Sequence, residues 1–534
     1  MNRPAGSDGE RVRAAEIIAS LSLATDLGIG VPLEHGLEST LFAMRLCDQL
    51  SVDAETASQT YYSCLLFYIG CTATAGVAAE VFPEDDALTR YSYPVRFASP
   101  VEMAGGMLRA LAPPAGSLPR QVVQIAGGAP RLAMRFPAVV RAICEVGLML
   151  SQRLGLPADV SELFAYVGER WDGRGAPARL RGEAIPLPVR IVHVARDAAF
   201  QRMLGGDDVA AGVIRERTSR GALDPEAASC FADASPAILA IEPDRSVWDD
   251  TLASEPHPRL ELDTDQIEQA LRAIGDFSDL VSPFLLGHSS GVADLAEAAA
   301  NGVGLDHDAQ VDVRRAALVH DIGRVAVPAR IWQHAGALST DDWERIRLHA
   351  YHSERVITRS ALLAPLAPIA AFHHERLDAS GYHRGTGAHG LSSAARVLAA
   401  ADAFHAMTEP RAHRQALPKE QAGQILSGEA QAGRLDPDAV TAVLRAVEIP
   451  VPRLERPAGL TAREAEVVGL IGRGLATKQI ARALSISTRT ADHHIQHAYR
   501  KMGVSTRASA ALFAMQHGLV TWAELPIPVD PHHP

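Results

Sequence analysis

The feature that most constrains this 534-residue chain is an internal repeat. Residues 169–192 and 375–398 align without gaps, and both run from Glu-Arg through an Asp-x-x-Gly turn to an apolar stretch that begins with Arg. Leu-Asp-Pro then follows in both halves, at 223–225 and 435–437, where it predicts a helix start because proline tolerates that position. A repeat of this length indicates that the same structural units fold twice.

The repeat extends upstream. The segment PLEHGLES around His35 matches LLGHSSGV around His288. At equal distances from these two histidines, LLFYIGC at 65–71 matches LVHDIGR at 318–324. We therefore predict two related domains, called copy one and copy two below.

Both copies have a helical pattern. Apolar residues recur at three- to four-residue spacing, as in VRRAALVHDIG, which favours helices over strands. The prediction is an all-α chain of two tandem helical domains and a small four-helix module. The expected parts are a disordered N-terminus (1–14), copy one (15–235), a linker (236–261), copy two (262–447), a Pro-rich linker (448–457), the C-terminal module (458–522) and a flexible tail (523–534).

Composition narrows the class of protein. The chain is 47% hydrophobic and 21% charged, which is ordinary for a globular protein and excludes disorder as the main state. Its five cysteines include no C-x-x-C pair, which favours a reducing cytoplasm over a disulfide framework or a thiolate zinc site. Residues 60–79 carry no charge, but no Lys/Arg cluster flanks them, so we expect a buried core helix and no membrane partner.

Copy two carries polar side chains that copy one lacks. His320 and Asp321 stand where copy one has Phe67 and Tyr68. Of the polar residues described next, only His288 keeps the same residue type in copy one, as His35. A lone histidine is more often structural than a ligand. The polar set of copy two is His288, His320, Asp321, His349, His373, His374 and Asp402.

This set predicts a metal site. No packing demand explains His-Asp or His-His pairs on separate helices, whereas imidazole and carboxylate together suit Fe, Mn, Zn or Ni. Seven ligands exceed what one tetrahedral ion uses, but two ions sharing Asp321 as a bridge would use them all. Such a pair activates water for attack on phosphorus at neutral pH.

On these motifs copy two resembles the HD-GYP subfamily of HD-domain phosphohydrolases, and copy one is a degenerate version. The matching segments are GHS, HDIGR, RLHAYHSER, HHER, DASGYH and AADAFHAM. The resemblance implies an all-α domain with two divalent transition-metal ions, Fe or Mn, that hydrolyses cyclic di-GMP. It makes the seven residues metal ligands with Asp321 bridging, makes Asp321 and Arg324 catalytic, and places Arg324, Gly381 and Tyr382 at the substrate.

Copy two departs from the subfamily in three places. His383 replaces the proline of the GYP turn, which puts cyclic di-GMP in doubt as the substrate. Arg324 replaces a lysine, and a planar fork is not equivalent to a point charge at phosphate. Phe284 stands where some members have an extra Glu ligand, which favours two metals over three, and His352 and His405 are rival ligands.

The C-terminal module differs in charge from the rest. Residues 458–520 carry a net charge of +5, while the whole chain carries −12, so the remainder is strongly acidic. A compact basic module of this kind is typical of nucleic-acid binding. Thr461 with Glu464 predicts a capping box, Gly474 a helix end and Ser487 the cap of a third helix, about 488–502. A second helix over 478–484 and a tight turn complete a helix-turn-helix.

This module resembles the LuxR-type helix-turn-helix over its full length, through LTxRExEV, KxIAxxL, SxxT, KMGVxxR and the final Ala-rich helix. The resemblance implies binding to double-stranded DNA by a homodimer. Asp492, His493 and Gln496 would face base edges, His494 would pack inside, and the phosphate contacts would be Lys478, Arg489, Lys501 and Arg507.

Three hypotheses follow for the whole chain. In the first, a cytoplasmic bacterial regulator combines a binuclear phosphohydrolase, acting on a cyclic dinucleotide or another phosphoester, with DNA binding. In the second, the HD copies only sense a nucleotide and dimerise, and transcription is the output. In the third, they form an inert dimerisation scaffold.

Overall fold

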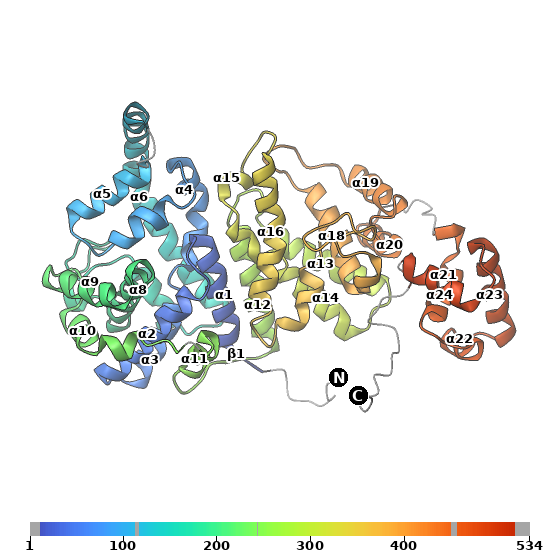
Figure 1. Cartoon of the computed structure of the whole chain (residues 1–534), viewed down its shortest axis with the longest axis horizontal. Coiled ribbons are helices and arrows are strands. Elements are labelled where there is room, and N and C mark those ends of the chain that lie inside the picture. Colours follow the sequence, from blue (N-terminus) through green and yellow to red (C-terminus); the bar gives the residue numbers. More distant parts are fainter. Residues whose placement is uncertain (1–10, 113–116, 243, 450–456, 518, 520–534) are drawn as a thin grey trace. The chain divides into compact units, whose positions relative to one another are not determined.

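The chain is built from helices (Figure 1). The computed structural model describes residues 11–112, 117–242, 244–449, 457–517 and 519. Within these residues the strands are limited to β1 (Val12–Arg13) and β2 (Glu261–Leu262), which pair antiparallel. The all-α prediction is therefore confirmed, but the prediction of a disordered N-terminus is wrong for residues 11–14, because Arg13 pairs with Glu261 at the end of the predicted linker and Val12 pairs with Leu262 at the start of copy two. Residues 1–10 lie outside the described part.

Copy one consists of helices of very different lengths. Its elements are α1 (Ala14–Ile29), α2 (His35–Leu50), α3 (Ala54–Leu65), η1 (Ile69–Thr74), α4 (Ala75–Val81), η2 (Leu88–Ser92), η3 (Tyr93–Val95), α5 (Pro100–Leu111), α6 (Leu118–Arg153), α7 (Ala158–Ser161), η4 (Glu162–Tyr166), η5 (Gly182–Ala184), α8 (Leu187–Gly205), α9 (Asp207–Ser219) and α10 (Pro225–Leu239). The predicted linker 236–261 is not a plain connection, since it holds the end of α10, helix α11 (Val247–Ala253) and the start of β2.

Copy two and the C-terminal module continue the helical pattern. Copy two contains α12 (Thr264–Asp279), α13 (His288–Gly302), α14 (His307–Val319), η6 (Ile322–Ala326), α15 (Ala329–Trp332), α16 (Thr340–Ile357), η7 (Ala364–Leu366), α17 (Ala367–Ala370), η8 (Ala388–Gly390), α18 (Ser393–Thr408), α19 (Lys419–Gln431) and α20 (Pro437–Ala446). The module contains η9 (Pro457–Gly459), α21 (Ala462–Gly472), α22 (Thr477–Ala483), α23 (Thr488–Met502) and α24 (Arg507–Gln516). The predicted linker at 450–456 and tail at 523–534 lie outside the described residues.

The uncharged segment is not one continuous helix. Residues 54–81 are long and apolar enough to cross a membrane, and 56% of their most apolar window is buried inside the protein. The segment divides into α3, η1 and α4, and residues 60–70 are buried while 71–80 are mostly half-buried. The prediction of a single core helix is therefore wrong in its continuity.

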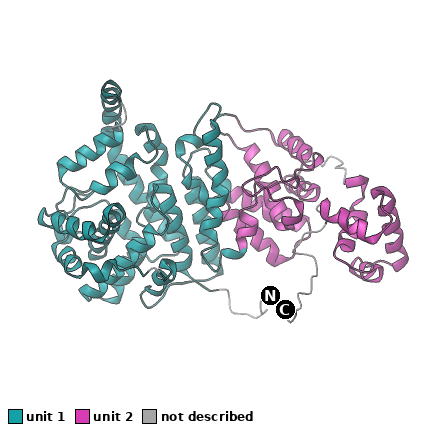
Figure 2. Cartoon of the chain, in the orientation of Figure 1, with its two compact units in different colours: residues 1–289, 321–365, 411–413 teal, residues 290–320, 366–410, 414–534 magenta. Residues whose placement is uncertain are grey.

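The chain forms two compact units whose boundaries do not follow the repeat (Figure 2). Unit 1 is residues 1–289, 321–365 and 411–413, and unit 2 is residues 290–320, 366–410 and 414–534. Copy one lies wholly in unit 1, whereas copy two is divided between the units.

The repeat is visible in buried or partly buried polar contacts that occur at matched positions of both copies. A carboxylate accepts a hydrogen bond from the backbone at the start of a helix, and the Arg of the repeat pairs with the Asp of Leu-Asp-Pro. The contacts are Asp26 with Gly36 N (3.1 Å), Asp279 with Ser289 N (2.9 Å), Arg190 with Asp224 (2.6 Å) and Arg396 with Asp436 (3.1 Å).

Candidate metal centre and DNA interface

Unit 1 gathers three of the predicted ligands around Asp321. The Asp321 Oδ2 atom lies 3.5 Å from His288 Nε2, and Asp321 Oδ1 lies 3.2 Å from His349 Nε2. All three side chains are at most 1% exposed. Asp321 comes directly before η6, His288 begins α13 and His349 lies within α16, so three separate elements bring these groups together.

Arg324 lies in the same group. Its Nη2 atom forms an ion pair with Asp321 Oδ2 at 2.6 Å and lies 3.3 Å from His288 Nε2. The guanidinium is 5.6 Å from the centre of the Trp332 ring, within the range of a cation–π contact. The arginine of HDIGR thus contacts the same carboxylate that the sequence predicts to bridge two metals.

The glycine of HDIGR is required by close packing. A Cβ on Gly323 would lie 2.2 Å from His349 O and 2.4 Å from Ser353 N, so any side chain would push η6 away from α16. The Gly323 N–H donates to Ser353 Oγ at 2.9 Å. Because η6 follows Asp321 and α16 carries His349, Gly323 sets the separation of two predicted ligands.

Unit 2 gathers the remaining predicted ligands around Asp402. His320 Nε2 and His374 Nδ1 each lie 3.8 Å from an Asp402 carboxylate oxygen. The His373 ring is 4.7 Å from the His320 ring and 4.1 Å from the His374 ring, between centroids. His320 and His373 are fully buried, and Asp402 is 2% exposed.

Three of the histidines are oriented in the same way. The Nδ1 atoms of His320, His349 and His373 each hydrogen-bond to the backbone carbonyl three residues earlier, that of Ala317, Ile346 and Ala370. A carbonyl can only accept, so Nδ1 carries the proton and Nε2 keeps its lone pair. This arrangement is common among metal-binding histidines, where the second nitrogen fixes the tautomer and ring direction. The residues present therefore fit a metal.

The altered GYP turn lies beside His374. Its Tyr382 ring stacks on the His374 ring at 4.6 Å, with 29° between the planes. Buried Glu375 holds the loop by accepting from Arg384 N at 2.7 Å and Thr386 N at 2.8 Å. A Cβ on Gly381 would lie 2.4 Å from His374 O, so glycine is required there.

The two rival ligands have surroundings of their own. His352 is half-buried on α16, and burial lowers the pKa of its imidazole to about 4. His405 Nδ1 lies 3.3 Å from Glu409 Oε1, and a Cβ on Gly291 would lie 2.0 Å from His405 Nε2. The sequence had not singled out Glu409 or Trp332, because neither stands in a recognisable motif.

Copy one fills the corresponding interior with rings and a guanidinium. Arg196, aligned with Asp402, is 3% exposed and lies 5.3 Å from the Phe67 ring and 4.7 Å from the Tyr68 ring. Its Nη2 donates to Cys64 O at 2.9 Å. A Cβ on Gly168, aligned with His374, would lie 2.3 Å from Ala176 O, which leaves no room for a ligand side chain.

His35, the copy-one counterpart of the predicted ligand His288, is also buried. His35 is 3% exposed and meets the Phe200 ring edge-to-face at 5.2 Å. Burial, assisted by the Arg196 charge, lowers the pKa of His35 to about 3, so the ring is neutral. The interpretation of His35 as a structural residue fits these surroundings.

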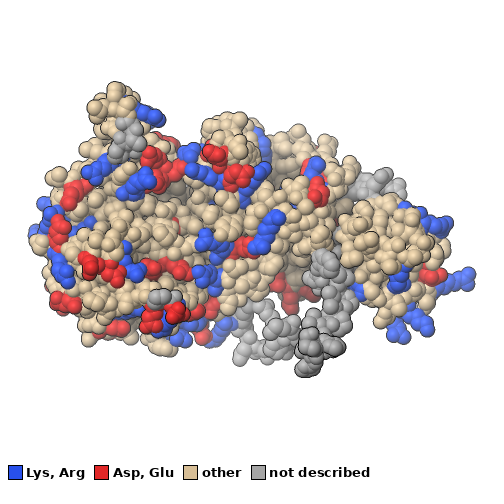
Figure 3. All heavy atoms as spheres, in the orientation of Figure 1, with Lys and Arg blue, Asp and Glu red and all other residues tan. Residues whose placement is uncertain are grey.

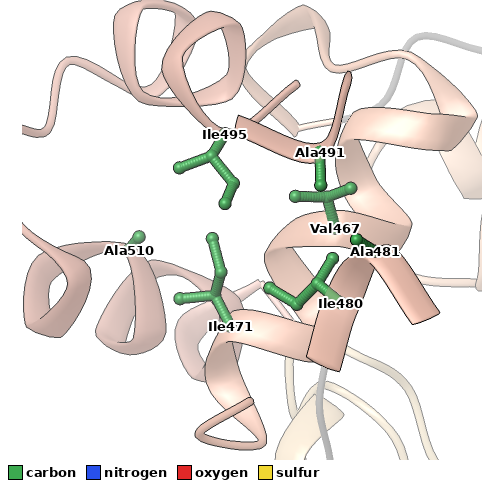
Figure 4. Packing of buried hydrophobic residues seen from close by; sticks show 7 residues of the cluster. All are labelled: Val467, Ile471, Ile480, Ala481, Ala491, Ile495 and Ala510. Carbon is green, nitrogen blue, oxygen red and sulfur yellow. The ribbon is translucent and has the colours of Figure 1, made fainter. Parts of the chain in front are cut away.

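The C-terminal module has the predicted helix-turn-helix (Figure 4). Thr461 and Glu464 form the capping box, and Ser487 accepts from Thr490 N at the start of α23. The core joins α21, α22, α23 and α24 through Val467, Ile471, Ile480, Ala481, Ala491, Ile495 and Ala510. Burying Ala491 and Ile495 turns Asp492, His493 and Gln496 to solvent on α23, and His494 is half-buried.

Two of the predicted phosphate contacts already have partners inside the module. Lys501 Nζ donates to Glu464 Oε2 at 2.6 Å and to Gly459 O at 3.0 Å. Although burial opposes ionisation, these contacts and the Thr461 hydrogen bonds lower the pKa of Glu464 to about 2. Arg507 donates to Leu475 O. Lys478 and Arg489 are exposed, and Figure 3 shows several basic side chains on this module.

Comparison with known proteins gives two family matches. The HD domain family matches residues 110–224 and 274–439, more than half of the chain. The luxR family of bacterial regulatory proteins matches residues 458–514.

Relatives and solved structures agree with these matches. The chain is 26% identical to 3′3′-cGAMP-specific phosphodiesterase 3 of Vibrio cholerae over 440 residues, 82% of this chain and 95% of that protein. It is 32% identical to a cyclic di-GMP phosphodiesterase of Thermotoga maritima over 161 residues, 30% of this chain and 43% of that protein. A crystal structure of a cyclic GMP-AMP-specific phosphodiesterase of V. cholerae covers 83% of this chain and 99% of its own, with TM-score 0.55 and 22% identity, which shows a shared fold.

Proposed function

Because this chain belongs to the HD-domain family and ends in a luxR-type module, we propose that it hydrolyses a cyclic dinucleotide and binds DNA as one regulator. The observation that carries the enzymatic part is the difference between the copies. Copy two buries imidazoles and carboxylates in both of its parts, whereas copy one has Phe67, Tyr68 and Arg196 at matched positions. Its relatives' names point to cyclic dinucleotides as the substrate class.

We propose that the seven residues hold two Fe or Mn ions. The support is the chemistry of the two groups, since imidazoles and carboxylates together suit these ions: His288, Asp321 and His349 lie in unit 1, and His320, His373, His374 and Asp402 lie in unit 2. Metal ions bound there would supply a hydroxide at neutral pH and a charge clamp for the phosphodiester.

The remaining roles fall to groups of this chain. In the proposed reaction the Arg324 guanidinium moves from Asp321 to a phosphoryl oxygen, which its planar fork can grip in a bidentate way. Tyr382, fixed by its stacking on His374, offers a ring face to a base of the dinucleotide. His383 stands in place of proline and changes the substrate side of this loop. We therefore expect the enzyme to prefer a cyclic dinucleotide other than cyclic di-GMP.

A matched pair of variants tests the enzymatic proposal. Protein loaded with Mn²⁺ is incubated with 3′3′-cGAMP, cyclic di-GMP and linear dinucleotides, and the products are separated by chromatography. We expect Asp321→Asn to lose at least about 1,000-fold in hydrolysis, the scale of losing a group that acts in the transition state, while Tyr68→Phe at the matched position of copy one keeps it. Absence of hydrolysis in the metal-loaded wild type, or full hydrolysis by Asp321→Asn, contradicts the proposal.

For the C-terminal module we propose sequence-specific binding of double-stranded DNA by a homodimer in the cytoplasm. Asp492, His493 and Gln496 would read bases, and Lys478 and Arg489 would contact phosphates. Lys478→Ala should weaken binding to all sequences alike and reduce its salt dependence, whereas Gln496→Ala should change sequence preference. Selection of binding sites from a random DNA library, followed by titration at several salt concentrations, measures both.

A second candidate is a transcription factor that senses a nucleotide without turning it over. His383 in the substrate loop favours it, since binding and turnover depend differently on that loop. In the Asp321→Ala variant hydrolysis is expected to vanish. If the DNA-binding response to the nucleotide is then unchanged, sensing alone is the signal; if the response is lost with hydrolysis, turnover is part of it.

A further inference from the structure

Trp332 is placed between two groups of the proposed active site. Its ring lies 5.6 Å below the Arg324 guanidinium and meets the His349 ring at 6.0 Å, with 75° between the planes. Its indole N–H donates to Arg324 O at 3.3 Å. One side chain therefore contacts both the guanidinium nearest Asp321 and the imidazole nearest Asp321.

The ring is also held by apolar packing inside unit 1. Trp332 packs against a cluster of Val281, Leu285 and Ala329, and also against a second cluster that includes Ile346 of α16. The residue ends α15, a short helix that follows η6 by two residues. Trp332 thus fixes the distance between the segment that carries Arg324 and the helix that carries His349.

Copy one supplies part of this support. Ala75 and Ala79 of α4 pack against the same Val281–Leu285–Ala329 cluster. A Cβ on Gly76 would lie 2.7 Å from the Gln333 side chain, so α4 approaches α15 closely. Helix α1 also approaches η6, since a Cβ added to Gly28 would lie 3.5 Å from the Cβ of Val325. The degenerate copy therefore backs the HDIGR segment without contributing a ligand.

We propose that Trp332 is a positioning residue of the active site, and that copy one serves as the rigid support behind it. This inference rests on the proposed function. In it the Trp332 ring orients His349 for a metal ion and holds Arg324 ready for the phosphodiester. A ring in this position acts as the outer partners of metal ligands do, whose removal usually lowers metal affinity or activity 10–100-fold.

The test compares Trp332→Leu with Trp332→Phe, and uses Trp171→Leu as a matched control. Trp171 lies 5.5 Å from the Arg190 guanidinium, the same kind of contact in the copy that lacks the ligand set. The readouts are Mn²⁺ affinity by calorimetry in the absence of substrate, the thermal midpoint of metal-free protein, and kcat and KM for cyclic dinucleotide hydrolysis.

We expect Trp332→Leu to weaken Mn²⁺ binding and to lower kcat by about tenfold each, with KM little changed. Trp171→Leu should leave the Mn²⁺ affinity, kcat and KM at wild-type values. Trp332→Phe keeps a ring and should retain both values within about threefold. Wild-type values for Trp332→Leu, or equal damage from Leu and Phe, overturns the role of the ring.

If Trp332→Leu fails to fold, a double-mutant cycle of Trp332→Phe with Arg324→Ala tests the role of the ring instead. The loss in kcat on Trp332→Phe should be smaller in an Arg324→Ala background than in the wild type, because the ring acts partly through that arginine. Additive losses overturn the proposal. A wild type that binds Mn²⁺ but hydrolyses nothing defeats the proposed function alone, since the affinity measurements still test Trp332.

Discussion

Copy one keeps the polar contacts that shape the HD scaffold, whereas its interior is filled with aromatic rings and Arg196. The loop after Glu169 is held as the loop after Glu375 is: Glu169 accepts from Ala178 N at 2.7 Å and Leu180 N at 2.9 Å. A Cβ on Gly175, as on Gly381, would lie 2.4 Å from the backbone. Both copies therefore keep the contacts that build the fold, whereas only copy two has the residues that would do the chemistry.

This difference shows what each kind of residue is for. Contacts present in both copies serve folding, because copy one retains them without a ligand set. Residues present only in copy two, such as His320 and Asp321, are not needed to form the scaffold. Arg196 illustrates the alternative: an interior without metal still needs a filled centre, and a guanidinium between Phe67 and Tyr68 supplies it.

The largest stability effect should come from emptying that centre. Arg196→Ala removes two ring contacts and the hydrogen bond to Cys64 O, and leaves a cavity, so we expect a loss of about 3 kcal/mol in unfolding free energy. Hydrolysis below the unfolding transition should be unchanged. Denaturant unfolding and a steady-state assay measure the two.

The control for this variant is Arg202→Ala on the same helix. Arg202 is 24% exposed at its side chain and pairs with Glu38 and Asp207 near the surface, so its loss should be about 1 kcal/mol or less. If Arg196→Ala abolishes hydrolysis while the protein stays folded, copy one takes a direct part in turnover and the comparison fails.

An intermediate effect is expected at the two loop-holding glutamates. Glu169→Gln and Glu375→Gln each replace one acceptor oxygen with a donor that faces a backbone N–H, so each should lose about 2 kcal/mol of stability. Only Glu375→Gln should also lower kcat, because only its loop carries Tyr382 next to a predicted ligand. Equal kinetic losses in the two variants would show that the loops are coupled.

Copy one should also show a stability change that appears only when the pH is varied. Burial raises the pKa of Asp26 from its ordinary 3.8 to about 7, although Arg196 opposes the shift. The raised pKa means that Asp26 contributes stability that is complete below about pH 4 and is lost as the pH rises through about 7. Relative to Asp26→Asn, the wild type should therefore lose up to about 4 kcal/mol of stability between pH 4 and pH 8, because each unit of the pKa difference corresponds to about 1.4 kcal/mol.

Asp53 provides the control for that measurement. This exposed helix cap has its pKa lowered by the hydrogen bonds from Thr56, so its contribution has the opposite sign and is lost as the pH falls. A flat difference between wild type and Asp26→Asn across this range would mean that Asp26 is ionised in the folded protein.

Local patterns in the sequence predicted the parts of the molecule that local forces decide. The helices of the C-terminal module were placed within a few residues, because Thr461 and Ser487 cap their own helices and Gly503 ends α23 in a left-handed conformation. The repeat predicted two helical domains, and the seven polar residues of copy two fall into two groups in which all but the half-buried His374 are buried. Their role as ligands stays a prediction.

What the sequence missed depends on partners far away along the chain. Val12 pairs with Leu262 across 250 residues, and no local pattern announces that strand. Helix α6 runs through Pro130 and Pro137, which local rules assign to helix breaks. The resemblance to the LuxR-type module makes Lys501 a phosphate contact, which stays a prediction, but no local pattern announces its ion pair with Glu464 on another helix.

The buried glutamate under each of the two matched loops, Glu169 in copy one and Glu375 in copy two, has a consequence for how these loops can change in sequence. Because Glu375 accepts from the main-chain N–H groups of Arg384 and Thr386, this anchor does not depend on which side chains stand at 382 and 383. In the proposed function, a substitution at these two positions would change substrate preference while the anchor of the loop stays in place. The two copies, with Ala-Pro in one and Tyr-His in the other, are two samples from that tolerance.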